Sequence, residues 1–197
     1  MKSRLIGHII LALCIAELAL ILISWLLSAT ETEGVHSLLS AEGIRWFFGN
    51  FVNVQRHQLL IWIILLAIAW GPFSQCGILQ RTKTKDFRSQ LARRVAIGFS
   101  IVYTILILLL ILPPHALLLS ATGGLWPSAF SHSIIPIISF YILFVGISYG
   151  IITNNFHSLS SVVDAMCLGI KKTAPLLVLY IFAMFFWASL LYVISFQ

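Results

Sequence analysis

The sequence predicts an all-α integral membrane protein, a bundle of about five transmembrane helices with two short amphipathic interfacial helices. Hydrophobic residues make up 60% of the chain, charged residues make up 9%, and the mean hydropathy is +1.02. Soluble domains are roughly half apolar and about a quarter charged, so this composition indicates a chain that lies in lipid. Its apolar residues form long continuous runs, whereas a β-barrel would show short alternating strands.

Five of these runs are long enough to cross a bilayer, because a transmembrane helix needs about 20 apolar residues. They are 5–27, 57–79, 95–112, 134–152 and 175–196. We treat residues 1–197 as a single transmembrane domain. The first run is longer than the roughly 7 to 15 apolar residues of a signal peptide, so we expect a retained anchor.

The segment 40–53 predicts a short amphipathic helix that cannot span the membrane. Ser40 can cap its first turn, where Glu42 suits the positive end of the helix dipole. One apolar stripe follows at helical spacing: Ile44, Phe47, Phe48, Phe51 and Val52. We expect this helix to lie in the outer interface or to pack across the bundle.

A second amphipathic helix is predicted at 158–171, on the cytoplasmic side. Its apolar positions recur with helical period and lie opposite Asp164 and Lys171. Thr173 and Pro175 then predict the separate start of the last span, with a cap and a proline in the first turn.

The basic residues indicate the orientation of the chain. Ten of the 12 Lys and Arg residues fall at the N-terminus and in alternate loops, and only Arg45 and Arg56 fall on the other side. The positive-inside rule therefore predicts a multi-pass protein of the cytoplasmic (inner) membrane, with its N-terminus cytoplasmic and its C-terminus outside. The net charge of +6 indicates contact with the lipid bilayer, and it gives no reason to expect a nucleic acid partner.

Glu17 is the one acid inside a predicted span. A charge at that depth costs on the order of 3 kcal/mol, so the side chain should be neutral, partnered or directed into a polar cavity. Two interpretations stay open. Glu17 is either a functional proton or cation site, or a neutral carboxyl group that is hydrogen-bonded to a neighbour.

Three other features of the spans are candidates for sites or contacts. Gly71 and Pro72 predict a kink or break in the second span, which either exposes carbonyl groups for a ligand or only bends the helix. Gly146 and Gly150 have the small-x-x-x-small spacing of closely packed helices. Ser148 between them could be imagined as a nucleophile, but nothing in the sequence places a base beside it.

The sequence contains no motif that would indicate enzymatic catalysis or metal binding. The chain contains no H-E-x-x-H zinc motif, no Walker loop and no dinucleotide fingerprint. Cys14, Cys76 and Cys167 are scattered, so they predict neither disulfides nor a metal site. We expect no enzymatic activity and no cofactor.

Several stretches resemble the p-aminobenzoyl-glutamate transporter (AbgT) family. "SLLSAEGIRWFFGNFV" fits a Leu-Leu-Ser-x-Glu-Gly-x-x-Trp pattern after the first span of that family. "SIIPIISFYILFVGISYGIITNNF", with Pro136 and the turn Tyr149-Gly150-Ile151, is similar to a later helix. "VVDAMCLGIKKTAPLLVLYIFAMFF" matches a Met-bearing amphipathic segment that leads into the next span.

The resemblance implies a shortened relative of these carriers. In the family, substrate contacts come largely from re-entrant hairpins and polar broken helices, for which we find no counterpart between Leu79 and Phe87 or beyond Phe196. We therefore expect a non-catalytic scaffold or accessory component, working as a homo-oligomer or with a partner membrane protein. The alternative is a small transporter or permease for a small organic anion, completed by oligomerisation or by a partner, with Glu17, Gly71 and Pro72 as its site.

Overall fold

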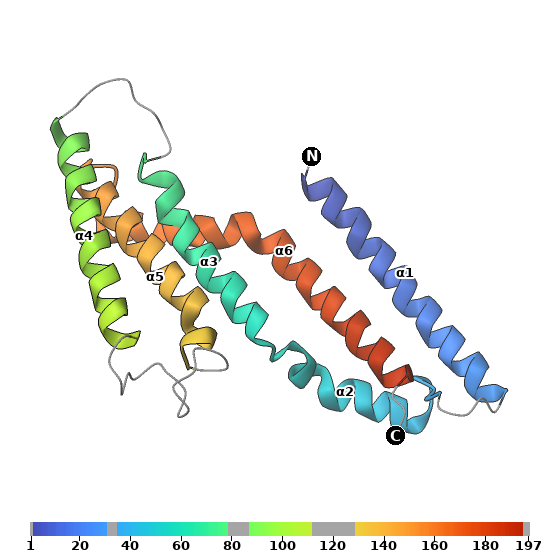
Figure 1. The fold of residues 1–197 in the computed structure, drawn as a ribbon. Helices are drawn as coiled ribbons and strands as arrows, with labels where there is room; N and C mark the ends of the chain where they lie inside the picture. Colours follow the sequence, from blue (N-terminus) through green and yellow to red (C-terminus); the bar gives the residue numbers. More distant parts are fainter. Residues whose placement is uncertain (1, 31–34, 79–86, 112–128, 195–197) are drawn as a thin grey trace. The chain divides into compact units, whose positions relative to one another are not determined.

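Six α-helices form the secondary structure of the residues that this computed structural model describes, which are 2–30, 35–78, 87–111 and 129–194 (Figure 1). The helices are α1 (Lys2–Ala29), α2 (Ala41–Gln55), α3 (Gln58–Gln75), α4 (Phe87–Ile111), α5 (Ala129–Ile152) and α6 (Leu159–Ile194). All except α2 are long and apolar enough to cross a membrane. The predicted fold class, an all-α membrane bundle, is confirmed.

The helix α2 has the predicted form of a short amphipathic helix. Ser40 is its N-cap, and the Ser40 hydroxyl accepts a hydrogen bond from the Gly43 backbone N–H at 3.0 Å. Residues 79–86, which include three of the basic residues assigned to the cytoplasmic side, lie outside the described residues. Residues 112–128 and the last two residues of the fifth predicted span also lie outside them.

One predicted boundary is wrong, because the chain does not stop and restart at Thr173 and Pro175. The predicted surface helix and the last span form a single helix, α6, with Pro175 inside it. A proline removes only one backbone hydrogen bond from a helix. In apolar surroundings the other backbone groups have no partner outside the helix, so a continuous helix satisfies more of them than a break.

The helix α3 also differs from its prediction. A kink or break at Gly71 and Pro72 and an end at Leu79 were expected. The helix is not broken at Pro72 and ends at Gln75, while the kink stays a prediction. The Cys76 N–H donates to the Pro72 carbonyl at 2.8 Å, which closes the last turn. Gly77 follows with φ of +89°, a left-handed conformation that ends helices and suits glycine.

The chain divides into two compact units, which are described separately below. Unit 1 comprises Met1–Ile61 and Thr173–Gln197, and unit 2 comprises Trp62–Lys172. Both α3 and α6 contribute residues to each unit. The assignment of the whole chain to a single transmembrane domain stays a prediction.

In unit 1, a buried serine ties α1 to the segment before α2. The Ser24 side chain is fully buried, and its hydroxyl donates to the Ile21 carbonyl at 2.9 Å within α1. The same oxygen accepts a hydrogen bond from the Leu38 N–H at 3.2 Å. Close by, the His36 N–H donates to the Val193 carbonyl of α6 at 3.3 Å. These bonds hold α1, the start of α2 and the end of α6 together.

The apolar stripe of α2, together with the neighbouring Trp46, divides between a protein contact and an exposed surface. Trp46 stacks on Tyr192 with 4.4 Å between ring centroids, and Phe51 lies at the same centroid distance from Phe185. Phe48 and Val52, on the same stripe, are 74% and 72% exposed. The short helix therefore braces the C-terminal half of α6 and turns its remaining apolar side chains outward.

In unit 2, small residues let helix backbones touch. Gly71 of α3 faces Ala165 and Gly169 of α6, and a Cβ atom on Gly71 would collide with the Ala165 carbonyl oxygen. On another side of α3, a Cβ on Gly146 of α5 would lie 2.8 Å from the Phe73 backbone nitrogen. Helices in lipid associate through such close packing, because burial of apolar surface gives little drive there.

The ends of α3 and α5 are joined by a side-chain amide. Asn155 Nδ2 donates to the Cys76 carbonyl at 2.7 Å, which satisfies a backbone group that the end of α3 leaves without a helical partner. The Asn155 backbone N–H donates to the Gly150 carbonyl at 2.8 Å, closing the turn after α5. Cys76, Phe156, Val162 and Ala165 form the buried core beneath this junction.

The α3–α6 crossing gives a stability prediction. Gly71→Ala should destabilise the folded chain by about 1–3 kcal/mol, because the new methyl group has to displace a backbone carbonyl. Gly98→Ala is the matched control, since nothing lies within 4 Å of a Cβ at Gly98 in α4. Thermal unfolding of both variants in detergent measures the difference. Equal melting temperatures for the two variants would contradict the packing described here.

Candidate functional site: a groove beside Glu17

A groove of about 500 Å³ lies within unit 1, between α1, α2 and the C-terminal half of α6. Its lining is apolar except for one carboxyl group and one thiol. The lining residues are Leu13, Cys14, Glu17, Leu18, Phe47, Phe51, Ile181, Phe182 and Phe185. We call this the Glu17 groove.

Helical spacing brings these side chains to the same place. Cys14, Glu17 and Leu18 follow one another at i, i+3 and i+4 along α1, so they share a face. On α6, Phe182 and Phe185 are three residues apart and Ile181 and Phe185 are four apart, so these side chains also share a face. Phe47 and Phe51 are one turn apart on α2 and pack on Phe185, which closes the third wall. The groove thus needs all three helices.

The Glu17 carboxyl group is held by one hydrogen bond and has one free oxygen. The Ser189 hydroxyl donates to Glu17 Oε1 at 2.6 Å, and the Ser189 side chain is fully buried. Glu17 Oε2 is also buried, but it has no hydrogen-bond partner among the described residues. Because a buried polar atom without a partner loses about 1–3 kcal/mol of solvation, an unpaired carboxylate oxygen calls for a physical explanation.

The chemistry available to this groove is narrow. Glu17 Oε2 can accept a hydrogen bond or pair with a cation, while the aromatic and aliphatic walls can contact an apolar body. Among the residues that the structure describes, no three His, Cys, Asp or Glu side chains lie close enough to hold a metal ion.

The other predicted site residues, Gly71 and Pro72, belong to unit 2. Both are buried, and they lie where α5 and α6 cross α3. Gly146, predicted to be a helix-packing residue, lies at the same crossing against the backbone of Pro72 and Phe73. The structure therefore brings Gly71, Pro72 and Gly146 together in a packing contact, and Glu17 is part of the other unit.

Gly150 and Ser148, from the same stretch as Gly146, lie in the last two turns of α5. A Cβ on Gly150 would collide with the ring of Phe156, which follows α5 in the same unit, so Gly150 accommodates the turn after its own helix. Ser148 lies inside α5. The nucleophile elbow of serine hydrolases requires a strand-to-helix turn, which an uninterrupted helix does not provide.

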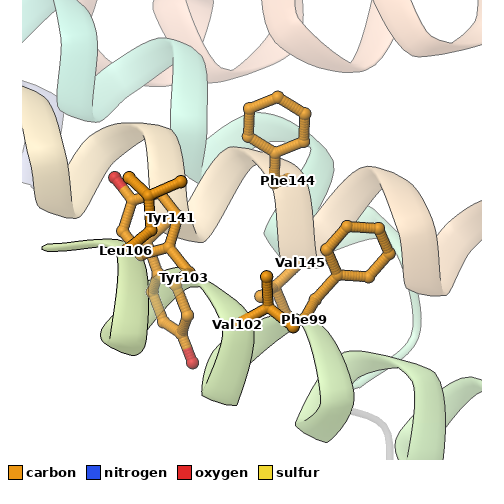
Figure 2. A pocket seen from close by; sticks show the side chains of 7 residues that line it. All are labelled: Phe99, Val102, Tyr103, Leu106, Tyr141, Phe144 and Val145. Carbon is orange, nitrogen blue, oxygen red and sulfur yellow. The ribbon is translucent and has the colours of Figure 1, made fainter. Parts of the chain in front are cut away.

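A second, smaller pocket of about 170 Å³ lies in unit 2 between α4 and α5. Figure 2 shows its seven lining side chains, which are Phe99, Val102, Tyr103, Leu106, Tyr141, Phe144 and Val145. Both tyrosine hydroxyls are already bonded, Tyr103 to the Ile137 carbonyl at 2.8 Å and Tyr141 to the Ser100 hydroxyl at 2.6 Å. The pocket is left with apolar walls, and this favours a packing gap over a selective site.

Sequence reasoning missed Ser189, the partner of Glu17. The signal available was weak: Ser189 is a single polar residue in the apolar run that ends α6. A search for the residue that neutralises Glu17 could have considered it. Its position one turn beyond Phe185 also places it on the helix face that lines the groove.

The comparison with protein families decides the identity of the chain. The model described as the "AbgT putative transporter family" matches residues 80–195 of the 197. The chain belongs to the AbgT transporter family. The matched region contains two of the three stretches on which the AbgT resemblance was based, and the segment 37–52 precedes it. Neither curated proteins nor solved structures gave a match.

AbgT membership and the five long apolar helices make this a multi-pass membrane protein related to transporters. The AbgT family is a family of transporters, which agrees with the absence of the enzyme motifs considered above from the sequence. Within this AbgT protein, the Glu17 groove is the candidate site that combines a cavity with an unpaired buried polar atom.

The hydrogen bond between Ser189 and Glu17 gives a second prediction. Ser189→Ala should destabilise the chain by about 1–3 kcal/mol, because it leaves both carboxyl oxygens of Glu17 without a donor. Ser139→Ala is the matched control: Ser139 is also buried, but its hydroxyl bonds only the Ile135 carbonyl of its own helix. Chemical unfolding in detergent compares the two variants. A loss for Ser189→Ala no larger than that for Ser139→Ala would contradict this role.

Proposed function

We propose that this chain is a non-catalytic scaffold or accessory component of an AbgT-type transport system in the cytoplasmic membrane. It works as a homo-oligomer or with a partner membrane protein. Membership of a transporter family supports the association with transport. Gly71, Pro72 and Gly146 pack helices against one another, and this packing supports the structural role.

The observation that carries the proposal is the crossing at Gly71 and Pro72. Alternating-access carriers bind cargo near the middle of the bilayer, often where a helix is broken and its backbone carbonyls are free to bind an ion. Here α3 is helical through Pro72, and the backbones of α5 and α6 approach this turn closely. The segment that would suit a carrier's ion site therefore acts as a contact between helices.

A second candidate function is a small transporter or permease that a second copy or a partner completes. The specific observation in its favour is the Glu17 groove, with its volume of about 500 Å³ and its free carboxyl oxygen. The resemblance suggests a small organic anion as the cargo. A carboxyl group is poorly suited to pair with an anion, so this alternative requires other groups to hold the cargo.

Flux measurements on Glu17 variants separate the two functions. We expect proteoliposomes with the purified chain alone to take up p-aminobenzoyl-glutamate no faster than protein-free liposomes, with Glu17→Gln behaving in the same way. A scaffold has no substrate path for Glu17 to control. Saturable uptake by the wild-type chain, lost in Glu17→Gln but kept in Glu42→Gln, would overturn the scaffold proposal. Glu42 serves as the control because it is an exposed acid on α2.

The proposed orientation can be tested with terminal reporters. Alkaline phosphatase is active only outside the cytoplasm, so its fusion to the C-terminus should be active and its fusion before Met1 inactive. The basic residues retained on the cytoplasmic side are the physical reason. Replacing Arg93 and Arg94 by Gln should weaken this preference, whereas replacing Arg45 should not. Activity from the N-terminal fusion alone would show the opposite orientation.

A further inference from the structure

We propose that the Glu17 groove binds a lipophilic amine, that is, an apolar molecule with a single ammonium group. This inference does not require transport, and it is independent of whether the chain acts as a scaffold. It rests on the shape of the groove, on the unpaired oxygen of Glu17 and on the aromatic rings around it.

The shape of the groove is that of a ligand site. Its volume of about 500 Å³ falls within the roughly 300–1,000 Å³ of small-molecule pockets, which are also mainly apolar with a few fixed polar groups. The edge residues Leu18 and Ile181 are 62% and 40% exposed. In a membrane such exposed apolar side chains contact lipid, so a ligand dissolved in the bilayer can enter from the side.

The charge of the groove selects the polar end of the ligand. Ser189 holds Oε1 at 2.6 Å and thereby fixes the direction of the carboxyl group, while Oε2 is buried without a partner. An ammonium N–H would give Oε2 a charge-assisted hydrogen bond, which is stronger than a neutral one in apolar surroundings. A fatty acid would place a second carboxyl group beside Glu17, and an alkane would leave Oε2 unpaired.

The phenylalanine rings select the rest of the ligand and add to the preference for a cation. Phe47, Phe51 and Phe185 pack together, with ring centroids 5.5 Å apart for Phe47–Phe185 and 4.4 Å apart for Phe51–Phe185. Phe182 adds a fourth ring to the lining. Aromatic faces attract cations within about 6 Å and provide flat contact area for an apolar body. An amine with an alkyl or aromatic body satisfies both the walls and the carboxyl group.

The test uses the full chain in lipid nanodiscs with dansylcadaverine, a fluorescent dye that carries one primary ammonium group on an alkyl chain with an aromatic body. Binding is measured by fluorescence polarisation relative to empty nanodiscs, and it is then competed with dodecylamine, dodecanol and dodecanoate. These three compounds share one alkyl chain and differ in the head group. We expect dodecylamine to displace the dye at concentrations at least tenfold lower than either of the others. Equal displacement by all three, or no dye binding, would overturn the proposal.

Variants locate the binding in the groove. Glu17→Gln should weaken dye binding at least tenfold, while Glu42→Gln, which changes an exposed acid outside the groove, should leave it unchanged. Cys14→Phe keeps Glu17 but fills the groove, so it should also abolish binding. Wild-type affinity in both Glu17→Gln and Cys14→Phe would show that the dye binds elsewhere.

A third experiment leaves the residues of the groove unchanged, so it tests the proposal even if Glu17→Gln does not fold. Cys14 lines the groove, Cys76 is buried in unit 2 and Cys167 is exposed, so a protein with both Cys76→Ser and Cys167→Ser reports Cys14 alone through its reaction with a membrane-permeant maleimide. Dodecylamine should slow this reaction at least fivefold, and dodecanol should not. Equal protection by both compounds would overturn the proposal.

Uptake of the dye that depends on Glu17 would support the site and overturn the scaffold function, while binding without uptake would support both proposals.

Discussion

A polar group in apolar surroundings can find a hydrogen bond only within the protein, and this constraint governs the structure. In unit 1, the buried hydroxyls of Ser24 and Ser189 each connect α1 to a different part of the chain. In unit 2, the Asn155 amide bonds the carbonyl that the end of α3 leaves free. Because lipid offers no substitute for these partners, each bond also fixes which segments are neighbours.

The same constraint explains why side chains are so small where the helices of unit 2 meet. Apolar side chains gain little by leaving lipid for protein, so close contact between helices has to come from dispersion and from backbone proximity. Gly71, Gly146 and Gly169 provide it by removing the Cβ atoms that would keep the helices apart. The Glu17 groove is the opposite case, because large side chains, including four phenylalanine rings, line a space beside a carboxyl group.

The fold class and the α2 helix could be predicted from local patterns. The length of the apolar runs is enough to distinguish transmembrane helices from strands. The Ser40 cap and the apolar stripe that follows it define α2. Boundaries were harder to predict because prolines are ambiguous in lipid. Helix α3 continues through Pro72, and helix α6 continues through Pro175. The end of α3 is followed instead by Gly77 in a left-handed conformation.

Of the two hydrogen-bonded residues in the candidate site, only Glu17 could be identified from the sequence. Glu17 stands out because an acid in a span is rare. Its partner Ser189 lies 172 residues away, and no local periodicity connects two positions at that distance. Gly71 and Pro72 are an ambiguous case, because one pattern describes both a broken helix with an ion site and a tight crossing. Only the positions of Ala165 and Gly146 distinguish them.

The division of the chain into units has a consequence for biosynthesis. Unit 2 is a continuous stretch, Trp62–Lys172, and can therefore assemble as soon as it has left the ribosome. Unit 1 joins the beginning of the chain to residues that follow Thr173, so α1 and α2 must wait in the membrane for the second half of α6. During that interval the ring of Trp46 and the carboxyl group of Glu17 lack Tyr192 and Ser189. Until then, the newly made N-terminal helices need a chaperone to shield these groups, and the membrane insertion machinery itself can serve as one.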